Sequence, residues 1–166
     1  MNEHKQYFKL REFIFNDRKP VPFHVAEKLV DHHLLPMNNI RNLAFPHPIF
    51  VSLKSGYRTP EHEESKGRSN SPHEFRENPD HADNGWGAVD YRVNPSVFPK
   101  FIRVMIKFSP YNRMTFYPEK QTPFIHCDYK FLGNGDKRYF VKMEGKWVSG
   151  TITDLIKSVD DRFAGQ

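Results

Sequence analysis

The sequence predicts one α+β domain over residues 1–166, with a mainly antiparallel central sheet flanked by helices. The length of 166 residues suits one domain with a hydrophobic core of its own. Apolar residues recur at helical spacing near both ends of the chain, and short segments of strand-like composition lie between them. The content of 37% hydrophobic and 14% aromatic residues excludes a wholly disordered chain.

The first helix is predicted between Pro20 and Leu34. Its apolar side chains recur at steps of three and four residues, which places them on one stripe of a helix. They are Phe23, Ala26, Val30 and Leu34. Because proline lacks a backbone N–H and clashes with the preceding turn, we expect Pro36 to end this helix. A short further turn is expected over residues 37–44.

A largely buried strand is expected over residues 49–56, where apolar residues are dense between a proline and a glycine. Thr59 and Pro60 then have the composition of an N-cap and a first helical residue, so another helix begins there. Residues 65–87 are rich in Gly, Ser, Asn and Asp and predict a long loop. A loop of this length in a small domain usually has a function.

The segment AVDYRV, residues 88–93, has the alternation of a strand, with Asp90 and Arg92 on the face opposite to Tyr91. A helix from about Pro99 follows. The apolar side chains on its predicted buried face are Phe101, Val104, Met105 and Phe108.

The C-terminal part predicts three strands, at residues 113–117, 124–130 and 138–143. The last of them joins residues 146–149 through Glu144 and Gly145, which predicts a hairpin. A final helix is expected from about Thr151.

The composition excludes several classes of protein. The 25 Lys and Arg against 20 Asp and Glu give a net charge of +5, but the basic residues are scattered and do not alternate with aromatic ones. No specific nucleic-acid binding is therefore predicted. The single cysteine, Cys127, excludes an intrachain disulfide and is expected to be a small buried hydrophobe rather than a nucleophile. No apolar run approaches the roughly 20 residues that span a bilayer, and the N-terminus lacks the apolar core of a signal peptide. We expect a soluble protein that does not bind a membrane.

Three side chains have the chemistry of a metal site. They are His73 in the polar loop, Asp90 on a predicted strand and His126 on a later strand. Two imidazoles and one carboxylate suit Zn²⁺, and three protein ligands leave a fourth tetrahedral position open to water, as in a catalytic zinc site. The intervals of 17 and 36 residues do not form a compact metal motif, so residue types and spacing alone do not establish a metal site. The remaining histidines outside the loop are expected at the surface or the edge of the core: His4, His24, His32, His33, His47 and His62.

Four motifs occur in a defined order: SGYRTPEH, GRSNSPH, GAVD and FIHCDY. Their order resembles the zinc D-Ala-D-Ala carboxypeptidase family, the LAS-type metallopeptidases, over most of the chain. The resemblance implies a LAS-type zinc peptidase fold and assigns His73, Asp90 and His126 as the Zn²⁺ ligands. It also implies that Arg58 binds a substrate carboxylate or polarises the scissile carbonyl. A planar guanidinium that stays charged is suited to this role.

The loop departs from the family pattern by its length. Relatives place the aspartate seven residues after the first histidine, whereas Asp90 follows His73 by 17 residues. About ten extra residues must therefore bulge out, which costs little because loop-closure entropy grows slowly with length. His81 lies within this insertion and is a rival for His73 as the ligand, or it lines the substrate cleft.

The general base is the second departure. Relatives often have a carboxylate three residues before the last histidine or a histidine two residues before it, but Pro123 and Phe124 stand there. Asp128 is the nearest substitute, because residues i and i+2 of a strand share a face. It is either the base or a partner that orients His126. Glu119 is a more distant candidate for the base.

The expected function is a zinc-dependent metallopeptidase that hydrolyses peptide bonds in peptidoglycan stem peptides. The resemblance allows a D,D-carboxypeptidase or an L-Ala-D-Glu-type endopeptidase. A phage enzyme made in the cytoplasm and acting at the cell wall or in a virion is the simplest setting. The alternative is a non-catalytic phage structural or wall-binding module that keeps the fold, and the missing base favours it. The sequence does not indicate an oligomeric state. Five aromatic residues are expected in the core or along the substrate groove: Tyr57, Trp86, Tyr91, Tyr111 and Tyr117.

Overall fold

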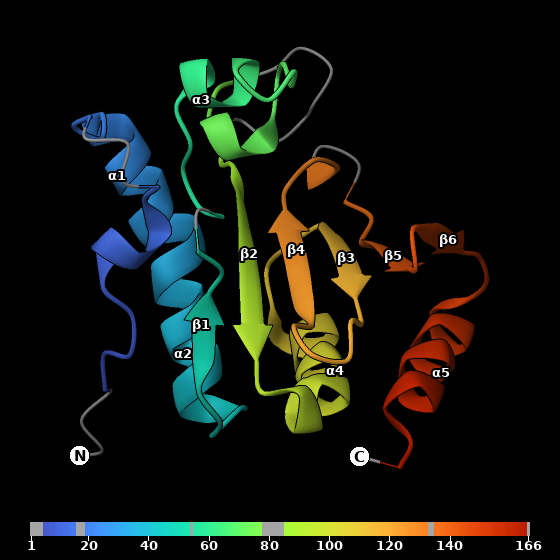
Figure 1. The fold of residues 1–166 in the computed structure, drawn as a ribbon. Coiled ribbons are helices and arrows are strands. Elements are labelled where there is room, and N and C mark those ends of the chain that lie inside the picture. The colour runs from blue at the N-terminus through green and yellow to red at the C-terminus, as the bar shows by residue number, and fades with distance from the viewer. Residues whose placement is uncertain (1–4, 16–18, 54, 78–84, 133–134, 166) are drawn as a thin grey trace.

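The computed structural model describes residues 5–15, 19–53, 55–77, 85–132 and 135–165. Its helical segments are η1 (Leu10–Phe13), α1 (Phe23–Leu29), η2 (Val30–Leu34), α2 (Leu35–Leu43), α3 (Pro60–Glu64), η3 (Pro72–Glu74), η4 (Pro95–Val97), α4 (Phe98–Phe108) and α5 (Ile152–Phe163). Its strands are β1 (Ile49–Val51), β2 (Ala88–Val93), β3 (Arg113–Tyr117), β4 (Phe124–Asp128), β5 (Arg138–Met143) and β6 (Lys146–Val148). The α+β class is as predicted (Figure 1).

The six strands form one mixed sheet in the order β1-β2-β4-β3-β5-β6. Neighbouring strands are antiparallel except β3 and β5, which are parallel, so the predicted mainly antiparallel sheet is corrected to a mixed one. Since β4 lies between β2 and β3, β5 joins the other edge of β3. The chain leaves β4 at Asp128, which pairs with Arg113, and β5 begins at Arg138, which pairs with the same residue. Starting at the same end, β5 has to run in the direction of β3.

The two faces of the sheet have different surroundings. Alternate strand residues such as Val89 and Tyr91 are fully buried in a core that also contains Phe101 and Met105 of α4, which lies behind the strands in Figure 1. Asp90 and its same-face neighbours point to the opposite side, as the alternation of β2 predicts. The candidate metal ligands lie on this opposite face.

The first helical segment does not end at Pro36, so that prediction is wrong. α1, η2 and α2 follow one another without a gap, and the N–H of Leu35 donates to the carbonyl of Val30 across a wide π turn. Pro36 leaves the carbonyl of His32 without its helical donor. The hydroxyl of Tyr129 donates to this carbonyl at 2.6 Å instead. The hydroxyl of Tyr129, the residue that follows β4, thus replaces the missing hydrogen bond.

The predicted apolar stripe of this segment is only partly right. Phe23 is 77% exposed, whereas Val25 and Leu29, and Met37 and Ile40 in α2, are buried. The π turn contains an extra residue and rotates the side chains that follow it. A single helical spacing therefore cannot describe both halves.

The strand predicted at residues 49–56 is shorter than expected. Only Ile49, Phe50 and Val51 pair with β2, and of these Ile49 is buried while Phe50 is 55% exposed. Leu53 is also exposed. β1 is an edge strand whose outer residues face solvent, which local composition does not reveal.

The remaining elements lie close to where the sequence places them, except that β4 ends at Asp128, two residues earlier than predicted, and that the loop predicted over residues 65–87 contains η3. Thr59 caps α3 by accepting from the His62 N–H at 3.3 Å, and Thr151 and Asp154 form a capping box at the start of α5. The predicted hairpin joins β5 to β6. α4 begins at Phe98 and buries its apolar face, but Phe108 at its end is 52% exposed.

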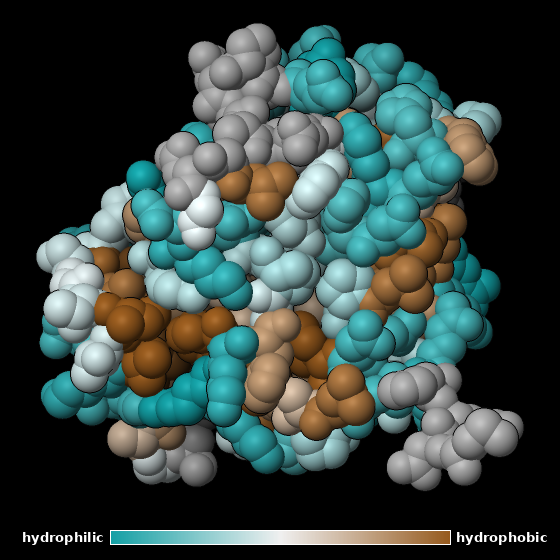
Figure 2. Space-filling model, turned by 180° about the vertical axis from the view of Figure 1, so that it is seen from behind, coloured by the Kyte–Doolittle hydropathy of each residue, from teal (hydrophilic) through white to brown (hydrophobic). Residues whose placement is uncertain are grey.

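Figure 2 shows the molecule from behind, where hydrophobic patches alternate with a largely hydrophilic surface. Within the described residues no helix has the length and apolar character to cross a membrane.

Candidate metal centre

Three side chains from distant parts of the chain meet on the face of the sheet opposite to the hydrophobic core. His73, Asp90 and His126 each offer one ligand atom, and these atoms all lie within 4.8 Å of one another. They come from η3, β2 and β4, respectively. These are the three residues predicted from the sequence as metal ligands.

The sheet register brings two of them together. Asp90 and His126 are directly paired between β2 and β4, so their side chains share a face. Nδ1 of His126 lies 2.8 Å from Oδ1 of Asp90. On the other side of β4, His126 is paired with Thr115 of β3. The separation of 36 residues is therefore closed by one ladder of backbone hydrogen bonds.

His73 is delivered by a capped 3₁₀ turn. The Ser71 hydroxyl accepts from the His73 N–H at 3.3 Å, and the Glu74 carboxylate accepts from the Ser71 N–H at 3.2 Å. This capping box gives the serine two positions before the histidine a structural role. Nδ1 of His73 lies 3.0 Å from the carbonyl oxygen of Gly56. Because a carbonyl only accepts, Nδ1 carries the proton, and the lone pair of Nε2 is available to a metal.

Nε2 of His73 lies on the side of Asp90, 3.8 Å from Oδ1. A second contact holds His73 to the segment between β1 and α3, because the backbone N–H of Arg58 donates to the His73 carbonyl at 2.9 Å. The rival ligand His81 lies outside the described residues.

The glycine of the GAVD motif has a packing role. Gly87 has a φ of +82°, and a Cβ there would lie 2.5 Å from the ring of Phe75. Phe75 itself has a left-handed backbone with a φ of 57° and is buried next to η3. The close approach of residue 87 to the ring of Phe75 therefore requires glycine.

The electrostatics of His126 are set by two carboxylates. Its Nε2 lies 2.8 Å from Oδ2 of Asp128 and its Nδ1 contacts Asp90. Burial by itself lowers the pKa of His126, but the hydrogen bonds to Asp128 and Asp90 outweigh burial and raise it to about 9. Burial raises the pKa of Asp90, and the nearby His126 outweighs this and lowers it. Without a metal, the site holds a charged imidazole between two carboxylates.

His73 differs from His126. Burial lowers the pKa of His73 to about 4, and Asp90 only partly opposes this effect. A neutral imidazole is the form that binds a metal.

Arg58 lies at the rim of the triad. Its guanidinium contacts Glu63 at 3.1 Å and Oδ2 of Asp90 at 3.8 Å, and its side chain is 11% exposed. Glu63 is fully buried in α3 and also pairs with Arg68. The guanidinium is thus fixed beside the candidate metal ligands, and its role towards a substrate stays a prediction.

Asp128 is fully buried behind His126. Nε of Arg113 on β3 donates to Oδ1 and Oδ2 of Asp128 at 3.0 and 2.8 Å. A terminal guanidinium nitrogen of Arg113 also contacts Oδ2. The Lys130 N–H donates to Oδ1 at 3.0 Å. With both oxygens occupied, Asp128 has the arrangement of a carboxylate that orients a metal-binding histidine. The geometry favours this of the two roles considered for it.

The donor set fits a divalent metal. In a tetrahedral zinc site with bonds of about 2.1 Å the ligand atoms lie about 3.4 Å apart. The two separations from Asp90 Oδ1, 2.8 Å to His126 Nδ1 and 3.8 Å to His73 Nε2, bracket this value, and the ligand atoms of all three residues lie within 4.8 Å of one another. His73 has its lone pair at Nε2, and His126 presents Nδ1 while Asp128 accepts from Nε2. The three residues would hold the ion with small adjustments of their side chains.

Arg113 and Glu63 belong to the site but were not predicted from the sequence. Each is a charged residue on a predicted element, and no local pattern shows that one contacts Asp128 and the other Arg58. Cys127 is fully buried, as expected for a small hydrophobe, and burial raises the pKa of its thiol. No contact in the described residues joins Glu119 to the triad.

The other candidates lie in the core or beside it. Tyr57, Tyr91 and Tyr111 are buried in the core, whereas Tyr117 is half-buried on the face of the triad. His33 is fully buried, so the prediction that it lies at the surface or the edge of the core is wrong. Its Nε2 donates to the Trp86 carbonyl at 2.8 Å, and its Nδ1 lies 3.1 Å from the Tyr111 hydroxyl.

No protein-family model, curated protein or solved structure matches the chain. The motif resemblance therefore remains a prediction.

Proposed function

We propose that the chain is a zinc-dependent metallopeptidase acting on peptidoglycan stem peptides. The observation that supports the proposal is the convergence of one ligand atom each from His73, Asp90 and His126, all within 4.8 Å of one another. Three such ligands leave a tetrahedral metal one open position, and Zn²⁺ there lowers the pKa of a bound water to about 7 and polarises a carbonyl. The motif resemblance directs the proposal to D,D-carboxypeptidase or L-Ala-D-Glu-type endopeptidase activity.

The protein side chains have separate roles in this proposal. His73, Asp90 and His126 bind the ion, and Asp128 accepts from the far nitrogen of His126 and keeps its ring oriented. Arg58 donates to the substrate carboxylate or to the oxygen that gains charge, because Glu63 holds it on the Asp90 side of the site. Burial of these groups strengthens each of these interactions.

The test uses purified protein, peptidoglycan sacculi and added Zn²⁺. We expect new amino groups to be released, the release to stop with a chelator, and His73→Ala and His126→Ala each to abolish it. His24→Ala, which changes an exposed histidine on α1, serves as the matched control. Mass spectrometry of the products distinguishes loss of a terminal D-Ala from cleavage at an internal bond. Hydrolysis that persists in both variants would contradict the proposal.

A non-catalytic wall-binding module is the second candidate, and the engagement of both Asp128 oxygens supports it. That function predicts one Zn²⁺ per chain and binding to sacculi without release of amines. Zinc content, sedimentation with sacculi and amine release, measured on one preparation, separate the two functions.

A further inference from the structure

The face of the sheet that holds the candidate metal ligands also carries Arg92, a cationic residue that is not part of the metal centre. Arg92 lies two residues after Asp90 on β2, so the two side chains share a face. Within the described residues no carboxylate lies within ion-pair distance of Arg92, and its buried Nε has no hydrogen-bond partner. A partly buried guanidinium without a counter-charge is costly unless a ligand supplies one.

The sheet register surrounds Arg92 with aromatic side chains. Arg92 pairs with Phe50 on β1 and with Phe124 on β4, and Phe124 pairs with Tyr117 on β3. The rings of Tyr117 and Phe124 are stacked, with centroids 4.3 Å apart and planes inclined by 7°. A stacked pair of aromatic rings thus lies next to one cation, two residues along the strands from the paired Asp90 and His126.

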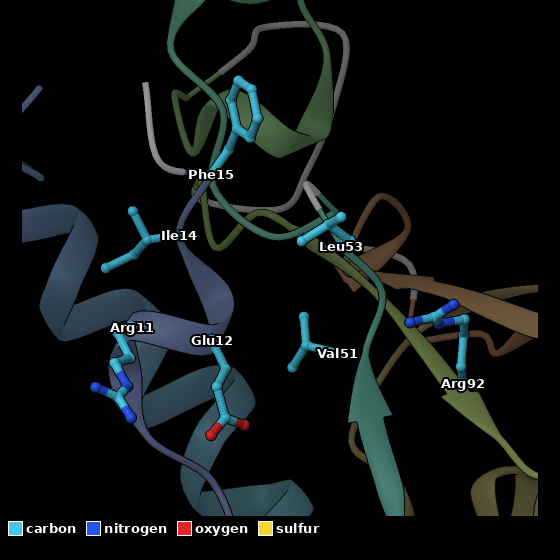
Figure 3. Close-up of a pocket in the computed structure, with 7 residues that line it drawn as sticks. All are labelled: Arg11, Glu12, Ile14, Phe15, Val51, Leu53 and Arg92. Carbon is cyan, nitrogen blue, oxygen red and sulfur yellow. The ribbon is translucent and has the colours of Figure 1, made fainter. Parts of the chain in front are cut away.

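Two hollows open at Arg92. One, of about 420 Å³, lies towards the N-terminal segment, and Figure 3 shows Arg92 across it from Glu12 and Arg11. The other, of about 380 Å³, lies between the end of β2 and the segment that leads into β4. Among the described residues that line this second hollow, Arg92 alone is ionisable, and the other polar ones are Asn94, Gln121 and Thr122. A guanidinium among neutral polar groups is suited to a carboxylate.

The spacing indicates which carboxylate. Strand residues advance by about 3.3 Å each, so Arg92 lies roughly 7 Å along β2 from Asp90. An extended peptide covers this distance in about two residues. A substrate whose scissile carbonyl lies at the triad would thus place a carboxylate about two residues away next to Arg92.

We propose that Arg92 and the hollow beside Asn94 form a subsite for a free carboxylate of the stem peptide, about two residues from the bond at the metal centre. Arg92 is then a specificity-determining residue, and Phe124 and Tyr117 support the intervening residue. The direction of the substrate rests on the proposed peptidase function, but the binding of the carboxylate does not.

The test compares two synthetic stem peptides that end in D-Ala-D-Ala and differ only at the α-carboxyl group of D-Glu, two residues before the D-Ala that carries the scissile carbonyl. This carboxyl group is free in one peptide and amidated in the other. Dissociation constants are measured calorimetrically with the wild-type chain in chelator, where no hydrolysis occurs, and kcat/KM is measured with Zn²⁺. We expect the free acid to bind about tenfold or more tightly than the amide, as hydrogen bonds to charged groups predict. Arg92→Gln should remove this preference and leave binding of the amide unchanged.

Arg103→Gln is the matched control, because Arg103 lies on the exposed side of α4 in an ion pair with Asp160. It should retain the full preference for the free acid. An equal preference in the wild-type chain and Arg92→Gln, or none in the wild-type chain, would overturn the subsite. If the peptides bind with this preference but are never cleaved, the subsite stands and the peptidase function fails.

Discussion

Nε2 of His126 lies 2.8 Å from Oδ2 of Asp128, a residue on the same strand whose carboxylate is fully buried. Asp128 thus fixes the orientation of the His126 ring, and the other ring nitrogen, Nδ1, faces Asp90. Arg113 completes the arrangement from the neighbouring strand by gripping the same carboxylate.

Asp128→Asn tests whether this carboxylate orients the histidine. The amide keeps the size of the side chain but loses the negative charge, so we expect the affinity for Zn²⁺ to fall about 10- to 100-fold. Competition with a chromophoric chelator measures it, and Asp160→Asn, at an exposed carboxylate, should leave the affinity unchanged. Full zinc affinity together with a lost kcat would instead identify Asp128 as the base.

Arg113→Met tests the buried ion pair. The variant leaves the Asp128 carboxylate buried with one fewer partner, and we expect the free energy of unfolding to fall by about 3 kcal/mol in urea titrations. Arg103→Met removes an arginine from a pair whose side chains are 48% and 39% exposed, and should cost no more than about 1 kcal/mol. Equal losses in the two variants would show that the Arg113 pair is no more important than a surface contact.

Tyr129→Phe tests why the first helical segment continues through Pro36. Loss of the hydroxyl leaves the His32 carbonyl without a donor, and we expect a destabilisation of about 1–3 kcal/mol. In a Pro36→Ala background the restored backbone N–H can serve this carbonyl, so the same tyrosine substitution should cost less. A double-mutant cycle from urea unfolding measures the difference. Additive costs would contradict this explanation.

His33 makes stability depend on pH. Burial lowers the pKa of His33 from its usual 6.5 to about 3. Between these values the unfolded chain binds the proton and the folded chain does not, so the free energy of unfolding falls as the pH decreases from 6.5 towards 3, by about 1.4 kcal/mol per pH unit. His33→Gln should therefore lose about 2 kcal/mol less than the wild-type chain between pH 7 and pH 5.

Urea titrations at the two pH values measure this difference for His33→Gln, and His24→Gln, at an exposed position, is the control. The control should behave as the wild-type chain. If His33→Gln has the same pH dependence as the wild-type chain, His33 is not the group that titrates.

Much of the fold could be predicted from local patterns. The alternation in residues 88–93, the Glu144–Gly145 hairpin and the caps at Thr59 and Thr151 act within a few residues of the chain, and the structure agrees with them. The parallel pairing of β3 with β5 and the passage of the helix through Pro36 were not predictable. The first depends on which sheet edge is already occupied, and the second on a hydroxyl 97 residues away.

The same division holds for the site. The residue types made His73, Asp90 and His126 candidates, because the chemistry of a metal ligand belongs to the side chain itself, and the resemblance of the motif order to a peptidase family assigned them as ligands. The pairing of Asp90 with His126, the contact of Arg113 with Asp128 and the placement of Arg92 beside Phe124 and Tyr117 depend on strand register. Register results from pairing between segments far apart in the chain, so only the folded molecule decides which side chains become neighbours.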